Sequence, residues 1–230
     1  MASLVDSIKN VVGDSHPYFK ISFLSFIIFL IIRLNSYEFI TSGIRIFLIL
    51  LLSVYVIGYL VQTIFNTLNE RNVILPNFLS VHTIIWTGIK SVIALLPIGA
   101  FGYALVMYVK TLLIFEPYIN NIILTLISIF VIALLALFTL IFGKSMKVSD
   151  AYNFKKILEH SGDFIVYSYL LAFTSALFLT VIFVPIGFAV NILFGMGLVF
   201  EYYIIFAVVF VLACVIQYYC QMYFEFIDLL

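Results

Sequence analysis

The chain has 230 residues, of which 65% are hydrophobic and only 10% are charged. So few charged side chains cannot cover the surface of a soluble domain, and the composition therefore excludes an ordinary water-soluble protein. The formal net charge is zero, so the chain has no overall basic field that would attract nucleic acid.

Six apolar segments are long enough to cross a bilayer, because a hydrocarbon core of about 30 Å requires roughly 20 residues of helix. Backbone amides must be paired within lipid, and these segments are too long for barrel strands, so we expect an all-α integral membrane protein. Pro97 lies inside the third segment and is expected to kink it. In chain order the predicted transmembrane helices are residues 18–34, 44–65, 91–115, 121–142, 164–184 and 200–224.

A segment with helical amphipathicity precedes the first, third and fifth of these helices, at residues 3–12, 79–90 and 149–160. We expect each to be a cytoplasmic interfacial helix followed by a transmembrane hairpin. The single membrane domain 1–230 would then contain three parallel pseudo-repeats, about 3–72, 73–147 and 148–226. Alternatively, any six-helix membrane protein has cytoplasmic linkers, and linkers at a membrane surface become amphipathic.

Lysine and arginine are unequally divided between the two sides of this topology, eight against three. By the positive-inside rule, both termini are expected in the cytoplasm, with the protein in the cell membrane. The eight cytoplasmic residues are Lys9, Lys20, Arg71, Lys90, Lys144, Lys147, Lys155 and Lys156, and the three opposite ones are Arg33, Arg45 and Lys110.

Polar side chains recur at helical spacing near the cytoplasmic ends of the second and sixth transmembrane helices. Such side chains are costly in lipid and usually face the helix bundle or a wet cavity. They are predicted to line a cytoplasm-facing vestibule, or else to form interhelical hydrogen bonds worth about 0.6 kcal/mol each on average. The residues are Gln62, Asn66, Gln217, Gln221 and Glu225.

The linker before the fifth transmembrane helix contains four lysines, which are candidate contacts for anionic lipid headgroups at about 1 kcal/mol each. The same lysines would also be explained by membrane orientation alone. They are Lys144, Lys147, Lys155 and Lys156. The sequence has no nucleophile elbow, no glycine-rich phosphate loop and no metal-ligand spacing, so we expect no catalytic residue, no metal and no cofactor.

Several short motifs resemble a prokaryotic, largely archaeal family of six-helix membrane proteins of unknown function. They are Gly58-Tyr59 with Asn66, then Leu75-Pro76-Asn77-Phe78 and Gly88-Ile89-Lys90, and finally Ala151-Tyr152-Asn153-Phe154 with Ile157-Leu158. The chain departs from that pattern at Leu79-Ser80, where an acidic residue is expected. The family is similar to the membrane domain fused to some glycerophosphodiester phosphodiesterases, which is their non-catalytic part. The resemblance therefore implies a helical membrane module and no catalytic residue.

These observations favour a non-enzymatic integral membrane protein, most simply a scaffold or accessory subunit whose partners are membrane lipids or other membrane-protein subunits. The alternative is a small transporter or channel that uses the polar vestibule. An enzyme acting on lipid is the least favoured, because acid-base or metal chemistry needs converging His, Asp, Glu or Cys residues, and the transmembrane segments contain almost none.

Overall fold

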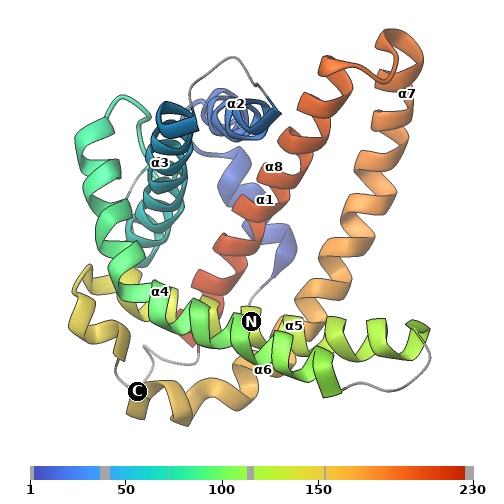
Figure 1. Ribbon diagram of the computed structural model, residues 1–230. Coiled ribbons are helices and arrows are strands. Elements are labelled where there is room, and N and C mark those ends of the chain that lie inside the picture. The colour runs from blue at the N-terminus through green and yellow to red at the C-terminus, as the bar shows by residue number, and fades with distance from the viewer. Residues whose placement is uncertain (1–2, 37–41, 72, 113–116, 153, 226–230) are drawn as a thin grey trace.

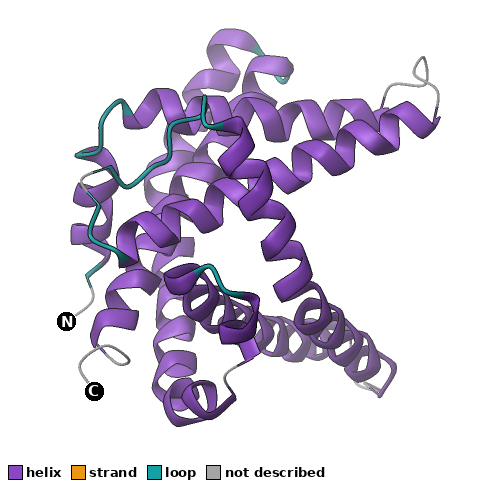
Figure 2. Cartoon of the chain, turned by 90° about the vertical axis from the view of Figure 1, so that its left-hand side faces the viewer, coloured by secondary structure: helices purple, strands orange, loops and turns teal. Residues whose placement is uncertain are grey.

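The computed structural model describes residues 3–36, 42–71, 73–112, 117–152 and 154–225. These residues form helices joined by short loops, with no strand among them (Figure 2). The all-α class predicted from the apolar segments is therefore confirmed. The elements, labelled in Figure 1, are α1 Leu4–Val12, α2 Pro17–Ser36, α3 Ser42–Leu68, α4 Val81–Leu112, α5 Pro117–Ser145, the 3₁₀ helix η1 Val148–Tyr152, α6 Phe154–Phe178, the π-helix η2 Leu179–Phe183, α7 Val184–Phe194 and α8 Leu198–Tyr223.

Six helical segments of the described chain are long and apolar enough to cross a membrane. Each one contains most of a predicted transmembrane helix, so the expected multi-pass architecture is confirmed at this level. The segments are Pro17–Asn35, Ser42–Leu68, Val81–Leu112, Tyr118–Ser145, Phe164–Phe194 and Leu198–Tyr223.

The first predicted interfacial segment is a helix separate from α2. Ser3 caps the start of α1, because its hydroxyl oxygen accepts a hydrogen bond from the Asp6 N–H at 3.4 Å. The chain then turns through His16, whose φ is +54°, and Pro17 begins α2 at the helical position where proline fits best. This turn allows α1 to pack against α8 instead of extending α2.

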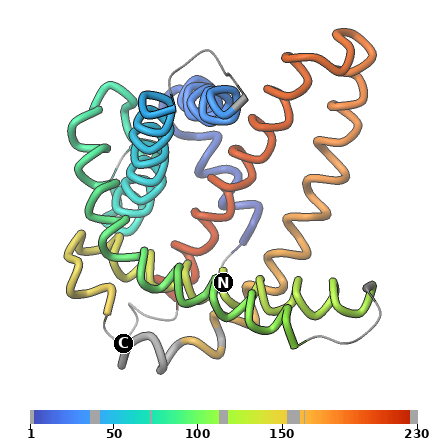
Figure 3. Tube along the Cα trace, viewed as in Figure 1, coloured from blue at the N-terminus to red at the C-terminus, as the bar shows by residue number. Residues whose placement is uncertain are grey.

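The other two predicted interfacial segments differ from expectation. Residues 81–90 are not a separate helix but form the first turns of α4, which continues without a break to Leu112. The direction change occurs later, since α4 contains Pro97 and bends part-way along its length (Figures 1 and 3). The third segment begins as η1, and α6 starts at Phe154.

The fifth membrane segment is interrupted by one π-helical turn. Pro185 follows η2 and lies at the start of α7. A proline lacks the N–H that would bond the carbonyl four residues earlier, and its ring crowds that carbonyl. The carbonyl in question belongs to Val181, inside η2, so Pro185 accounts for the local widening of the helix.

Helix α8 lies at the centre of the arrangement, and α3 and α4 approach each other closely beside it. Along its length α8 packs against α1, α2, α3 and α7 (Figure 1). The close approach of α3 to α4 occurs at Gly58 and Gly88. A Cβ on Gly58 would lie 1.9 Å from the carbonyl oxygen of Ile84, and one on Gly88 would lie 2.1 Å from that of Val54.

Consecutive membrane segments contact each other, since α2 packs on α3, α4 on α5 and α7 on α8. The axes of the membrane segments are not all parallel. The second half of α4 and the whole of α5 cross the lower part of Figures 1 and 3 at a large angle to α7 and α8.

Candidate functional site

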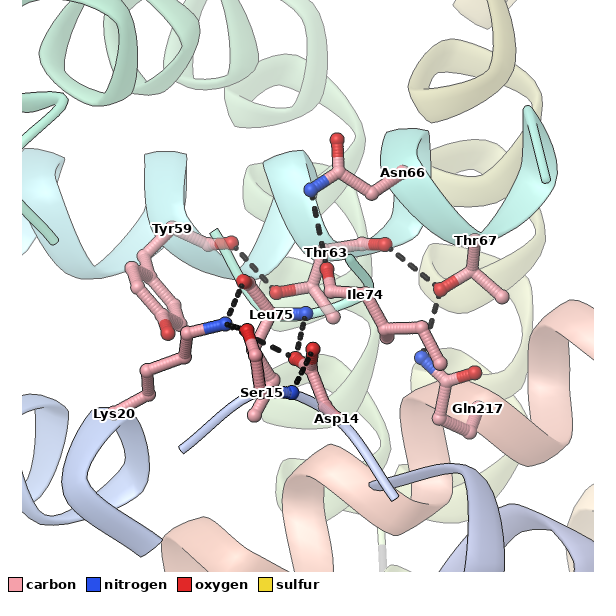
Figure 4. Close-up of polar contacts among 10 residues, drawn as sticks. All are labelled: Asp14, Ser15, Lys20, Tyr59, Thr63, Asn66, Thr67, Ile74, Leu75 and Gln217. Atoms are coloured by element: carbon pink, nitrogen blue, oxygen red, sulfur yellow. Dashed lines mark hydrogen bonds and ion pairs between the residues drawn. The ribbon is translucent and has the colours of Figure 1, made fainter. Parts of the chain in front are cut away.

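A buried ion pair between Asp14, in the turn before α2, and Lys20, in α2, is hydrogen-bonded to the loop that follows α3 (Figure 4). The Lys20 ammonium lies 3.3 Å from Oδ2 of Asp14, and the two side chains are 8% and 0% exposed. The same Asp14 oxygen accepts the Leu75 N–H at 2.6 Å, while Lys20 donates to the Leu75 carbonyl oxygen at 2.8 Å. Ser15 donates its N–H to Asp14 Oδ1 and accepts from Lys20 at its hydroxyl oxygen. We call these four residues the loop clamp.

The loop clamp satisfies two charges that would be costly to bury alone. The Asp14 carboxylate accepts three hydrogen bonds, and the Lys20 ammonium donates all three of its protons. Because both backbone polar groups of Leu75 take part, the clamp holds the main chain and does not depend on the polarity of the side chain at that position.

Two further hydrogen bonds attach the same loop to α3. The amide nitrogen of Asn66 donates to the Ile74 carbonyl oxygen at 3.1 Å, and the Tyr55 hydroxyl donates to that of Phe78 at 2.9 Å. Gln62 holds the Asn66 amide, since its nitrogen lies 3.2 Å from the Asn66 oxygen. The loop between α3 and α4 is thus fixed to α3 on both sides of Leu75.

This loop also borders a polar groove of about 550 Å³ between the end of α3 and the start of α4. We call it the α3–α4 groove. Among the described residues that line it, Arg71 is the only charged one, and its guanidinium carbon lies 4.6 Å from the Phe65 ring centroid. The polar residues that line it are Gln62, Asn66, Arg71, Asn77, Ser80 and Thr83.

The five residues predicted to form one vestibule lie in different places and do not line a single space. Gln62 and Asn66 line the α3–α4 groove. Gln217 is completely buried, and its amide nitrogen donates to the Thr67 hydroxyl at 2.7 Å. Gln221 accepts the Ser3 N–H at 2.9 Å. Glu225 is half-buried beyond the end of α8.

The hydrogen-bonding groups of Gln217 are only partly satisfied. Its Oε1 is buried and has no hydrogen-bond partner among the described residues. The Thr67 hydroxyl that it contacts donates in turn to the Thr63 carbonyl oxygen, so these residues form a short polar chain between α3 and α8 (Figure 4).

The space between α3, α5 and α8, where a vestibule would continue into the membrane, is a cavity of about 300 Å³ with an almost wholly apolar lining. Leu60, Ile132 and Ile216 are among the residues that face it. Two other cavities, about 440 Å³ between α4 and α5 and about 390 Å³ between α7 and α8, are apolar as well. Of these four spaces, only the α3–α4 groove is rich in polar groups.

The four lysines predicted to contact anionic lipid are placed only in part. The Lys144 ammonium lies 5.4 Å from the Tyr223 ring centroid, at the ends of α5 and α8, and Lys147 is exposed just beyond α5. The side chains of Lys155 and Lys156 lie outside the described residues.

At the opposite end of the bundle, Arg33 of α2 forms an ion pair with Glu201 of α8. The guanidinium also packs over the Phe29 ring, at 5.4 Å from its centroid. This pairing could not be predicted from the sequence, because Arg33 and Glu201 belong to helices that lie far apart in the chain.

The sequence reasoning missed Asp14 and Lys20 as a pair. A signal was present, since Lys20 stands among the first residues of an apolar segment, where a charge requires a partner. The acceptor and donor on Leu75 could not be anticipated, because they belong to the backbone of a loop 55 residues away from Lys20.

Within the described ranges, no three His, Cys, Asp or Glu residues come close enough together to hold a metal ion. Comparisons with protein-family models, with curated proteins and with solved structures found no match to this chain.

Proposed function

We propose that the protein is a non-enzymatic integral membrane protein that acts as a scaffold or accessory subunit and contacts lipids or partner helices. The observation that supports this role is the use of its polar side chains. Gln217, Gln221 and Asn66 are engaged in hydrogen bonds between parts of the chain, and the space between α3, α5 and α8 is apolar. Such bonds hold helices together, and among the described residues the space between α3, α5 and α8 offers few polar groups to a solute.

We further propose a cell-membrane location with both termini in the cytoplasm, for which the distribution of lysine and arginine is the support. The proposed organisation into three parallel units, residues 3–72, 73–147 and 148–226, rests on the recurrence of amphipathic segments in the sequence, because the contacts within the three helix pairs are matched by those of α3 with α4 and of α5 with α6. The large angle between α5 and α8 counts against close similarity of the units. The resemblance to the archaeal family stays a prediction.

The partner surface that we propose is the outer face of the fifth membrane segment, Phe164–Phe194. This segment comprises the end of α6, η2 and α7, and it is the least buried of the six. A photoactivatable residue introduced at Val181, which is 67% exposed, should form adducts with lipid or with a discrete membrane protein in native membranes. The matched control is Ala213, which is buried in α8 and should give none. Equal labelling from both positions would contradict the proposed arrangement.

A small transporter or channel is the second candidate, favoured by the α3–α4 groove, which could serve as a cytoplasmic entrance. Purified protein in sealed vesicles distinguishes the two candidates. A scaffold gives no solute flux above that of protein-free vesicles. Flux that disappears in Gln62→Leu, with the fold retained, would replace the scaffold proposal with the transporter.

A further inference from the structure

We propose that the α3–α4 groove binds a phosphate group, carried either by a lipid headgroup or by a soluble ion. This inference rests on the proposed membrane role but not on the choice between scaffold and transporter. The groove volume of about 550 Å³ is within the usual range for small-ligand sites, roughly 300–1,000 Å³. The described residues of its lining include one cation, Arg71, and no carboxylate, so their net charge is positive.

Several donors in the groove are not used by the protein itself. Arg71 forms no ion pair among the described residues, and the hydroxyls of Ser80 and Thr83 donate to no other described group. The Asn77 amide is oriented by its oxygen, which accepts the Leu79 N–H at 3.1 Å, so its NH₂ group is left free to donate. A guanidinium with hydroxyl and amide donors is suited to phosphate oxygens.

The side-chain amides of Gln62 and Asn66 also line the groove, but they form hydrogen bonds within the protein. Gln62 accepts from the Thr87 hydroxyl and donates to Asn66, which donates to the Ile74 carbonyl oxygen. These bonds support the wall of the groove and leave its open donors to the ligand. A cation would instead require carboxylate oxygens, and the lining contains none.

The loop clamp holds the groove in shape before any ligand binds. Arg71, Pro76 and Asn77 line the groove, whereas the intervening Leu75 is bound through its backbone to the ion pair of Asp14 and Lys20. A loop that is already ordered loses less conformational entropy on binding.

The surroundings of the groove indicate a membrane interface. Leu79 is 73% exposed beside Ser80, and Trp86, also exposed, lies on the first turns of α4 with the Lys90 ammonium 5.8 Å from its ring centroid. Exposed apolar and tryptophan side chains at a helix end are typical of the headgroup level. A lipid headgroup and a soluble phosphate present the same phosphate chemistry to the groove, and the experiment below distinguishes these two sources.

The test is a titration of the purified full chain in detergent, followed by native mass spectrometry, with phosphatidylglycerol, phosphatidylcholine and inorganic phosphate as probes. We expect phosphatidylglycerol to bind about tenfold more tightly than phosphatidylcholine, whose choline cation offsets the phosphate charge. Arg71→Gln should weaken phosphatidylglycerol binding about tenfold, because a charge-assisted hydrogen bond is lost. Arg71→Lys should retain part of the affinity, and Ser80→Ala should lower it severalfold.

The matched control is Lys9→Gln, which removes a charge from the exposed face of α1 and should change binding by less than twofold. Binding of inorganic phosphate that is lost in Arg71→Gln would assign the site to soluble phosphate, and lipid binding alone would assign it to headgroups. Equal losses in Arg71→Gln and Lys9→Gln, or no binding of phosphatidylglycerol and of inorganic phosphate, would overturn the inference. If Arg71→Gln does not fold, Ser80→Ala and Arg71→Lys decide the outcome. The Val181 crosslinking experiment tests the proposed function separately, because its result does not depend on phosphate binding in the α3–α4 groove.

Discussion

The close approach of α3 to α4 permits a sharp prediction for Gly58→Ala. The added methyl group would lie 1.9 Å from the Ile84 carbonyl oxygen and 2.8 Å from the Gly88 nitrogen. Both atoms belong to the backbone of α4 and cannot move aside as a side chain would. The oxygen must retreat by about 1.5 Å to reach the ordinary contact distance of 3.4 Å, so the two helices must separate.

The magnitude follows from this separation. Overpacking of a well-packed core costs about 1–3 kcal/mol, occasionally more. A gap of about 0.5–1 Å already forfeits a quarter to a half of each van der Waals contact. Since the required shift is larger than that gap, we expect Gly58→Ala to lower the free energy of unfolding by about 3 kcal/mol or more. Gly88→Ala, whose methyl group would lie 2.1 Å from the Val54 carbonyl oxygen, should behave alike.

The assay is equilibrium unfolding in mixed micelles with increasing dodecyl sulfate, followed by circular dichroism and by the fluorescence of Trp86, the single tryptophan. Gly99→Ala is the matched control, because it lies in α4 and its methyl group would meet nothing within 4 Å. Its stability should stay within about 1 kcal/mol of the parent. A loss below about 0.5 kcal/mol for Gly58→Ala would show that the helices do not pack as described.

Three other substitutions test the polar contacts by the same unfolding assay. Lys20→Met leaves the Asp14 carboxylate buried without its cation and should cost about 3–5 kcal/mol; a cost under about 1 kcal/mol would mean that the pair is hydrated. Gln217→Leu removes one hydrogen bond but also a buried oxygen without a partner, so stability should change by less than about 1 kcal/mol in either direction. A loss above about 2 kcal/mol would indicate that this oxygen has a partner after all. Tyr55→Phe removes the bond to the Phe78 carbonyl, should cost about 1 kcal/mol, and should speed hydrogen exchange in residues 73–80; unchanged exchange there would refute the attachment.

The number and position of the membrane segments could be predicted from the sequence. Within lipid the backbone N–H and C=O groups must be hydrogen-bonded inside the protein, and a long apolar helix does this within a single segment. The kink was also predictable, since Pro97 cannot complete the helical hydrogen bonds at its position. The separate helix expected at residues 79–90 was not found, because amphipathicity alone does not end a helix and residues 89–96, which span the expected boundary, contain no glycine or proline.

The polar contacts were predictable in kind but not in arrangement. Gln62 and Asn66 share one face of α3 with similar spacing to Gln217 and Gln221 on α8, and the sequence could not tell that the two pairs contact different segments. Whether a polar residue meets a cavity or another helix depends on helix rotation, which is set by packing between distant parts of the chain. The sequence analysis used Arg71 only as one of the cytoplasmic basic residues. It lies in a loop, where no helical spacing relates it to Gln62 and Asn66.

The loop clamp also has a consequence for the order of events during synthesis. Asp14 and Leu75 are separated by 61 residues, which a ribosome adds in roughly 3 to 12 seconds at about 5–20 residues per second. The ion pair can therefore capture the loop while the rest of the protein is still unmade, and residues 14–75 can assemble as a first unit. Helix α8 is translated after the other described helices, yet it packs against α1 and α2. These two helices must consequently keep a lipid-facing surface open until α8 arrives.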